Sequence, residues 1–126
     1  MLVVGVCVSG KSTLVAGLRE LGYEAYGVAQ EHSLVPRLWA MGRPDFVVML
    51  DCKYQTARKR RAIAWGPERL EEQRKRLANA LGHCHLYVRT DQLSAAEVLW
   101  VVVNAIKRAV KGHSAVGLAT VDRQLL

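Results

Sequence analysis

Cysteine pairs, long apolar runs and aromatic side chains are scarce or missing in this chain of 126 residues. Its three cysteines, Cys7, Cys52 and Cys84, are an odd number without C-x-x-C spacing, so we expect a reducing, cytoplasmic environment and no disulfide framework. Cys84 lies between His83 and His85. Adjacent residues of an extended strand point to opposite faces, which argues against a zinc site at this place.

The chain also has no long apolar segment. No run of apolar residues approaches the roughly 20 that a membrane-spanning helix needs, so we expect no membrane partner. We expect no signal peptide either, because the first apolar residues lead directly into a glycine-rich loop. Apolar residues make up 51% of the chain, without repeats or low-complexity segments, which indicates a single globular domain.

Aromatic residues make up only 6% of the chain, and this affects how its net charge of +7 is interpreted. Nine Lys and Arg residues lie between positions 53 and 76 against three Glu, so this segment carries +6 of the total. A concentrated basic segment indicates a polyanionic partner, either nucleotide phosphates or nucleic acid. Tyr54 and Trp65 are its only aromatic residues and it has no groove-reading motif, so nucleic acid is the less favoured partner.

The most informative feature that the chain does contain is a glycine-rich loop near its start. Residues 5–12, GVCVSGKS, fit the pattern G-x-x-x-x-G-K-[ST] at every specified position. The apolar residues 1–4 predict a buried strand before it, and the residues from Lys11 onward predict a helix after it. Gly5 and Gly10 permit the backbone angles that let successive N–H groups point at one phosphate. The sequence therefore predicts a phosphate-binding P-loop, with a chance glycine turn as the alternative.

Two residues of this loop have separate expected tasks. Lys11 would reach the β- and γ-phosphates of a nucleotide, and the Ser12 hydroxyl would ligate Mg²⁺. We therefore expect ATP, or another nucleoside triphosphate, and Mg²⁺ as cofactors. The residues predicted to bind the nucleotide phosphates are Gly5, Val8, Ser9, Gly10, Lys11, Ser12 and Thr13.

Hydrophobic periodicity predicts an alternation of strands and helices along the rest of the chain. Such an alternation predicts a short, mostly parallel sheet of four to five strands with helices on both faces. This is the three-layer α/β/α architecture of a P-loop NTPase fold. We place the domain at 1–111, with a basic lid region at about 53–76. The segment 112–126 is expected to be a tail that is loose, docks as a strand or mediates homo-oligomerisation. The expected elements are strands at 1–4, 23–29, 46–50 and 86–88, and helices at 11–21, 33–41, 53–64, 67–81 and 95–110.

Three motifs resemble those of the P-loop kinase superfamily that includes shikimate, gluconate and adenylate kinases. They are GVCVSGKST at 5–13, FVVMLD at 46–51 before an arginine-rich helix, and HLYVRTDQLSAAEV at 85–98. No N-K-x-D run typical of GTPases is present. The resemblance implies Mg²⁺-dependent transfer of the γ-phosphoryl group of ATP to a small metabolite or nucleotide. A P-loop NTPase or nucleotide-binding regulator without an acceptor remains the alternative, because the chain between Gly27 and Phe46 is too short for the family's acceptor-binding helices.

In such kinases, arginines that follow the strand ending in Leu-Asp close over the phosphates as a lid. The resemblance places Arg58, Arg60, Arg61 and also Arg69 near the transferred phosphoryl group, with Arg58 and Arg61 as catalytic residues and Arg60 as a nucleotide-binding residue. On one helix, Arg58 and Arg61 share a face and Arg60 points elsewhere, so they cannot all reach one nucleotide. A solvated basic face is the alternative.

Shikimate-type kinases also carry an acidic residue at the end of the second strand, which orients the acceptor hydroxyl or a metal-bound water. Glu31 occupies this place, and we expect it to act as a base or at the Mg²⁺ ion, with His32 assisting substrate binding. A solvent-facing glutamate beside a histidine near a helix cap is the alternative interpretation.

Other residues have less specific expected roles. Asp51 ends an apolar strand and resembles a Walker B aspartate, although in these kinases the acid at this place mostly begins the lid helix. Trp39 and Trp65 could line an acceptor pocket, or they could be buried or anchor the lid. Thr90 and Asp91 lie where these kinases turn around the adenine ring. Backbone contacts dominate recognition there, so the identity of these two residues does not indicate a role in base binding.

Overall fold

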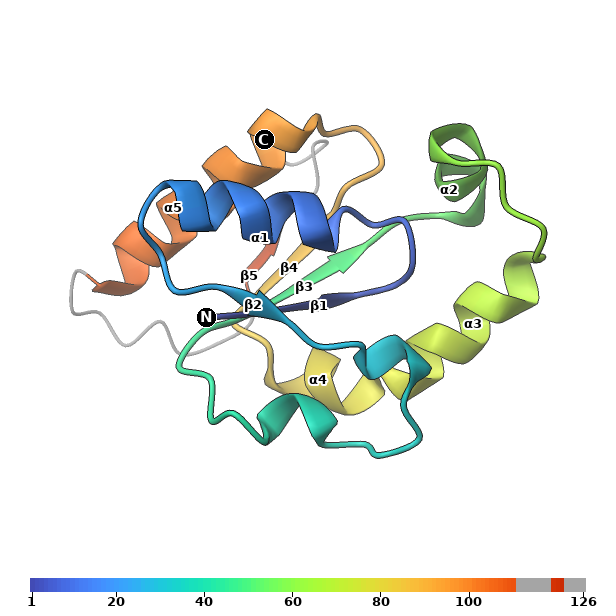
Figure 1. The fold of residues 1–126 in the computed structure, drawn as a ribbon, viewed down its shortest axis with the longest axis horizontal. Helices are drawn as coiled ribbons and strands as arrows, with labels where there is room; N and C mark the ends of the chain where they lie inside the picture. Colours follow the sequence, from blue (N-terminus) through green and yellow to red (C-terminus); the bar gives the residue numbers. More distant parts are fainter. Residues whose placement is uncertain (111–118, 122–126) are drawn as a thin grey trace.

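A parallel β-sheet lies between two layers of helices in the computed structural model, which describes residues 1–110 and 119–121 (Figure 1). In chain order, with η for a 3₁₀ turn, the elements are β1 (Leu2–Gly5), α1 (Lys11–Glu20), β2 (Tyr26–Gly27), η1 (Gln30–His32), η2 (Leu38–Ala40), β3 (Val47–Asp51), α2 (Tyr54–Arg60), α3 (Pro67–Arg76), α4 (Ala78–His83), β4 (Leu86–Arg89), α5 (Ala95–Val110) and β5 (Ala119–Val121). The strand order is β2-β1-β3-β4-β5, and every neighbouring pair is parallel. The predicted α/β class and the predicted parallel sheet are confirmed.

Alternation of side chains along the strands divides the core into two halves. Val3 and Val48 pack with α1 and α5. Leu2, Val4 and Val47, which point the other way, pack with α3 and α4. All five side chains are at most 1% exposed. β1 and β3 are therefore covered on both faces, as their continuous apolar runs predict.

The strand order reverses at β1. From β1 the chain crosses through α1 to the edge strand β2 and then returns past β1 to β3. Helices α1 and α5 cover one face of the sheet and α3 and α4 cover the other (Figure 1). In open parallel sheets, ligands bind beyond the carboxyl ends of the strands at such a reversal. The loops that follow β1 and β3 lie at this place.

The basic helix after β3 is shorter than predicted. The helix expected over 53–64 ends at Arg60, because Arg61 has extended backbone angles of φ −153° and ψ 144°. The chain then runs without regular structure to α3, and this lets Ile63 and Trp65 pack against the half of the core beneath α3. The apolar surface that these two partly buried side chains remove from water favours this irregular run over a longer helix.

The helix predicted over 67–81 bends and becomes α3 and α4. At the bend, Leu77 has φ −92° and ψ −4°, and its side chain is fully buried. The bend turns the buried face of the helix, so Ala80 is fully buried, whereas Leu81 is 39% exposed.

The segment after α1 is less regular than predicted. The strand expected over 23–29 consists only of the two residues of β2. Gln30 is fully buried. Its Oε1 accepts the backbone N–H of Trp39 at 2.9 Å, and its Nε2 donates to the Val35 carbonyl at 2.8 Å. These hydrogen bonds turn the chain soon after the strand, where residues 30–32 form the 3₁₀ turn η1. The helix expected over 33–41 is reduced to one 3₁₀ turn, η2.

Most of the predicted tail, 112–126, lies outside the described residues. Within it, Ala119–Val121 form β5 and pair with β4, so docking as a strand, one of the three alternatives, holds for this short segment. Among the helices of residues 1–110, none combines the length and the hydrophobicity needed to cross a bilayer.

Candidate functional site

The loop between β1 and α1 has a backbone that few residue types could adopt. A Cβ on Gly5 would collide with the Leu50 carbonyl of β3 and lie 2.9 Å from Ser9 Oγ, so this close approach requires glycine. Gly10 has φ +102° and Val8 has φ +64°, both in the left-handed region. The Ser9 hydroxyl, 2% exposed, donates to a loop carbonyl at 2.7 Å. The loop leads into the N-terminus of α1, whose first N–H groups have no partner within the helix.

The ammonium group of Lys11 lies at the centre of the site. Its Nζ donates to the Gly5 carbonyl at 2.9 Å and forms an ion pair with Glu31 Oε2. The side chains of Lys11 and Glu31 are 19% and 4% exposed, so the ion pair lies mostly out of water. Glu31 Oε1 is buried and has no hydrogen-bond partner among the described residues. Glu31 is therefore not the solvent-facing residue of the alternative interpretation, because a carboxylate buried in this way requires a neighbouring cation.

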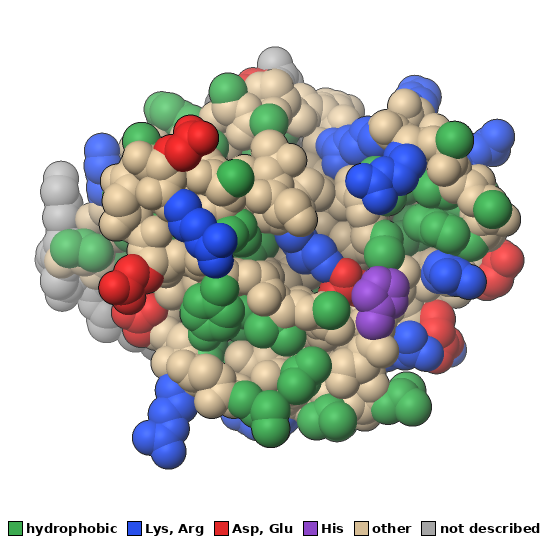
Figure 2. Space-filling model, viewed as in Figure 1, with side chains coloured by type: hydrophobic (Ala, Val, Ile, Leu, Met, Phe, Trp, Pro, Cys, Tyr) green, Lys and Arg blue, Asp and Glu red, His purple; other side chains and the backbone are tan. Residues whose placement is uncertain are grey.

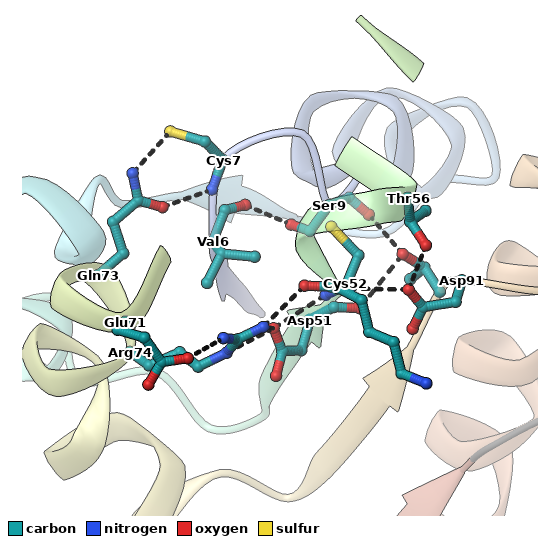
Figure 3. Close-up of polar contacts among 12 residues, drawn as sticks. Val6, Cys7, Ser9, Asp51, Cys52, Thr56, Glu71, Gln73, Arg74 and Asp91 are labelled. Atoms are coloured by element: carbon teal, nitrogen blue, oxygen red, sulfur yellow. Dashed lines mark hydrogen bonds and ion pairs between the residues drawn. The ribbon is translucent and has the colours of Figure 1, made fainter. Parts of the chain in front are cut away.

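Cys7 and His32 adjoin this ion pair. Cys7 Sγ lies 3.4 Å from His32 Nε2, which lies 3.8 Å from Glu31 Oε2. Gln73 of α3 is 1% exposed and holds Cys7 at two points: its Oε1 accepts the Cys7 N–H at 2.9 Å and its Nε2 donates to the sulfur at 3.3 Å (Figure 3). Sequence reasoning missed this contact, because 66 positions separate the two residues.

Of the predicted lid arginines, Arg60 is the one that contacts the loop. Its guanidinium donates to the Val8 carbonyl at 3.0 Å, to the Thr90 carbonyl at 2.5 Å and to Thr90 Oγ1 at 3.0 Å. Arg58 instead lies over an aromatic ring of its own helix, with Cζ 5.8 Å from the ring centroid. Arg61 follows the end of α2, and in the described part of the chain neither it nor Arg58 forms a hydrogen bond or ion pair with the loop. Their catalytic roles stay predictions.

We expect Arg60→Gln to lower the free energy of unfolding by about 1 kcal/mol, because three hydrogen bonds from a charged group are lost. Hydrogen–deuterium exchange of the peptide that contains residues 5–13 should become faster as well. Arg58→Gln is the matched control and should change the free energy of unfolding by less than about 0.5 kcal/mol. Equal effects of the two substitutions on urea unfolding would show that Arg60 does not hold the loop.

A cleft of about 210 Å³ opens between the loop, Thr90 and the start of α5. Its polar lining includes Ser9, Thr13, Arg60 and Thr90, and its apolar lining includes Leu14, Leu93 and Val98. Ser12 is exposed in the first turn of α1 and lies on the other side of that helix, where Lys11 and Ser12 line a hollow toward β2. The structure therefore brings Val8, Ser9, Gly10, Thr13 and Arg60 together around one cleft, and Lys11, Ser12 and Glu31 beside it.

Asp51 is held by neighbours outside the loop. Its Oδ2 accepts the Tyr87 hydroxyl at 2.6 Å. Its Oδ1 accepts the Cys52 N–H at 2.9 Å and lies 3.4 Å from Arg74 Nη2 (Figure 3). Burial, together with the hydrogen bond to Asp51, raises the pKa of Tyr87 to about 12. Within the described residues Asp51 makes no hydrogen bond or ion pair with Lys11, so its resemblance to a Walker B aspartate stays untested.

A wider cleft of about 1000 Å³ lies beside His32, between η1 and the length of α3. Trp65, Arg69 and Arg76 line it, together with two glutamates of α3. Figure 2 shows Lys and Arg side chains gathered over α2 and mixed with acidic ones over α3. Trp39, in contrast, is 6% exposed and donates its indole N–H to a side chain of α4 at 2.9 Å, so it belongs to the core.

The three thiols differ in their surroundings, and we expect them to differ in reactivity. Burial raises the pKa of Cys52 to about 11, against a smaller opposing effect of Arg60, and burial raises the pKa of Cys84 to about 11. At pH 8 their thiolate fractions are about 100-fold below that of an ordinary cysteine. Iodoacetamide should therefore modify the half-buried Cys7 first. Mass spectrometry of the digested protein checks this; modification of Cys52 or Cys84 at the rate of Cys7 would contradict it.

Comparisons with known proteins assign no function to this geometry. No family model matches the sequence, and no curated protein is significantly similar to it. The interpretation of the site therefore depends on the motifs and contacts described above.

Proposed function

We propose that this chain is a P-loop protein of the shikimate, gluconate and adenylate kinase type, which binds ATP with Mg²⁺ and transfers its γ-phosphoryl group to a small metabolite or nucleotide. The observation that carries the proposal is the position of the Lys11 ammonium, fixed by the Gly5 carbonyl and Glu31 at the helix terminus that follows the glycine-rich loop. In this position a phosphate group could replace Glu31 as the partner of Lys11.

The cleft beside the loop supports a nucleotide as the donor. Its floor, at Ser9, Gly10 and Thr13, adjoins the N-terminus of α1, which favours anionic groups. Its apolar wall at Leu93 and Val98 suits a purine or pyrimidine ring. Arg60, Thr90 and Asp91 would then lie near the nucleoside.

Phosphoryl transfer needs positioned charge more than covalent chemistry by the protein. Lys11 would neutralise the charge on the β- and γ-phosphates, and Ser12 would contribute a hydroxyl ligand to Mg²⁺. An ion held there would supply further positive charge beside the phosphate oxygens. Glu31, released from Lys11, would orient the acceptor hydroxyl or a water at the metal. Arg58 and Arg61 would approach only through a movement of the lid.

The wider cleft supports an acceptor on the other side of Glu31 and His32. Arg69 and Arg76 line it and Trp65 adds an aromatic surface, a combination that suits a small anionic acceptor. The connection between β2 and β3 favours the alternative, an NTPase or nucleotide-binding regulator without an acceptor. It forms only the two 3₁₀ turns η1 and η2, where kinases of this type have acceptor-binding helices.

An acceptor screen that monitors ADP production, with Lys11→Ala as the control, tests the proposal. A kinase should turn over ATP faster when a suitable acceptor is added, and the Lys11→Ala protein should not. ATP hydrolysis that no acceptor accelerates would favour the regulator or NTPase. Absence of Lys11-dependent ADP formation under all conditions would overturn the proposed catalysis.

Within this proposal, Glu31→Gln should lower the rate of ADP formation by about 100-fold, because the amide can neither accept a proton nor hold a metal-bound water as a carboxylate does. The variant also keeps the shape of the side chain. The rate at saturating ATP is the measurement. A Glu31→Gln protein with the full rate would exclude Glu31 from catalysis.

A further inference from the structure

Cys7, Glu31 and His32 form a group that nothing in the proposed phosphoryl transfer requires as a set. One ligand atom from each side chain, a sulfur, a carboxylate oxygen and an imidazole nitrogen, lies within 4.8 Å of the other two. They come from two loops, one after β1 and one after β2, that meet at the carboxyl ends of the strands. We propose that these three side chains bind a Zn²⁺ ion, independently of nucleotide.

The spacing of the ligand atoms fits a tetrahedral ion. Zinc lies about 2.3 Å from a thiolate and about 2.0–2.1 Å from an imidazole or carboxylate ligand, so two ligands at a tetrahedral angle are about 3.3–3.6 Å apart. Cys7 Sγ and His32 Nε2 are 3.4 Å apart, and His32 Nε2 and Glu31 Oε2 are 3.8 Å apart. Small side-chain rotations would bring the three atoms to zinc-ligand distances.

The carboxylate of Glu31 supplies a second, independent observation. Its side chain is 4% exposed, and its Oε1 is buried without a hydrogen-bond partner in the described part of the chain. Lys11 occupies only the other oxygen. A buried carboxylate oxygen is seldom left unpaired, because its desolvation is then uncompensated. A Zn²⁺ ion contacted by both oxygens of this carboxylate would compensate Oε1 and would share Oε2 with the Lys11 ammonium.

Gln73 holds the sulfur in place. It accepts the Cys7 N–H through Oε1 and donates to Cys7 Sγ from Nε2, so both the backbone and the side chain of Cys7 are oriented (Figure 3). A hydrogen bond to sulfur stabilises a thiolate, and such supporting residues fix metal ligands in many sites. On binding, Cys7 would release its thiol proton to solvent as the Zn–S bond forms.

The donor set also determines which ion fits. Thiolate and imidazole ligands select Zn²⁺ over Mg²⁺, which prefers oxygen ligands in an octahedral arrangement. His32 is 52% exposed, so a fourth zinc ligand could be a water molecule. Among the described residues, Cys84 forms no such group with His83 and His85: its sulfur donates to the Leu81 carbonyl, and His85 Nδ1 accepts the Val47 N–H.

Titration of the nucleotide-free protein with Zn²⁺, and with Co²⁺ as a spectroscopic probe, tests the site. We expect one equivalent of metal to bind and the Co²⁺ complex to show a thiolate charge-transfer band. Excess Mg²⁺ should not displace the Zn²⁺. Cys7→Ser should weaken Zn²⁺ binding by at least about 100-fold and abolish the band, and Gln73→Leu should weaken it by about tenfold. Cys84→Ser is the matched control and should bind as the unchanged protein does.

Two further variants keep the test decisive. His32→Gln changes an exposed side chain, so it should fold even if Cys7→Ser does not, and it should also lose about 100-fold in Zn²⁺ affinity. Lys11→Ala removes the ammonium that the proposed phosphoryl transfer needs but no zinc ligand, and its Zn²⁺ affinity should be unchanged or higher. Absence of Zn²⁺ binding, or equal affinity of the His32→Gln and unchanged proteins, would overturn the zinc site and leave the proposed kinase function untouched.

Discussion

Lys11→Ala should lower the free energy of unfolding by about 3 kcal/mol, although it removes only one partly exposed side chain. The substitution leaves the Glu31 carboxylate, 4% exposed, without its cation. Removal of one partner from a buried ion pair costs more than the ion pair itself contributes, because the remaining charge stays desolvated. Urea unfolding followed by circular dichroism measures the change.

Two comparisons isolate the cause of this loss. In the double variant Lys11→Ala/Glu31→Gln no buried charge is left, so most of the lost stability should return. Lys75→Ala removes a partner from the exposed ion pair with Glu72, whose N–O distance is 3.9 Å, and should cost less than about 0.5 kcal/mol. If the double variant were less stable than Lys11→Ala alone, the buried charge would not be the cause.

Gly5→Ala should lower the free energy of unfolding by a similar amount, about 3 kcal/mol. The added Cβ would collide with the Leu50 carbonyl, which belongs to the backbone of the central strand β3 and cannot move without disturbing the sheet. Separation of β1 from β3 at this point would also displace the loop and lower nucleotide affinity. Thermal unfolding measures the first effect and nucleotide titration the second.

Gly82→Ala is the matched control for this substitution. Gly82 lies in α4, and a Cβ there would meet nothing within 4 Å. Alanine has the higher helix propensity, so this variant should be more stable by about 0.5–1 kcal/mol. If both glycine substitutions had the same effect, the close approach at Gly5 would not determine its cost.

The features that sequence predicted well are those encoded by local patterns. Continuous apolar runs predicted β1 and β3, because strands covered on both faces need no polar side chain. The glycine spacing predicted the loop between β1 and α1, where Gly5 and Gly10 have the close approach and the positive φ that glycine permits. The resemblance to shikimate-type kinases placed Glu31 at the end of the second strand; in the structure Glu31 lies beyond β2, in η1, and forms an ion pair with Lys11.

The features that sequence could not predict depend on contacts between distant segments. The early end of α2 follows from the packing of the partly buried Ile63 and Trp65 against the core, and the short β2 follows from the buried hydrogen bonds of Gln30. Helical periodicity placed Arg58 and Arg61 on one face, but the residue that reaches the loop is Arg60, through the carbonyls of Val8 and Thr90. No local pattern contains these tertiary partners.

The cluster of Cys7 with His32 and Gln73 was missed for the same reason. Spacing along the chain is the only guide that a sequence offers to a metal site, and it indicates Cys84, which lies between two histidines. The fold instead places Cys7 beside His32, 25 positions away, and Gln73, 66 positions away. A cysteine at a variable position of the glycine-rich loop, which follows the carboxyl end of β1, is the sequence signal that points to this cluster.

Binding of Mg²⁺-ATP measured by isothermal titration calorimetry tests most directly whether the glycine-rich loop binds a nucleoside triphosphate. The unchanged protein should bind one equivalent. The double variant Lys11→Ala/Glu31→Gln, which retains the fold without a buried charge, should bind about 10- to 100-fold more weakly, the range that one hydrogen bond to a charged group contributes. Absence of binding by the unchanged protein, or equal affinity of the two proteins, would contradict the assignment of this loop.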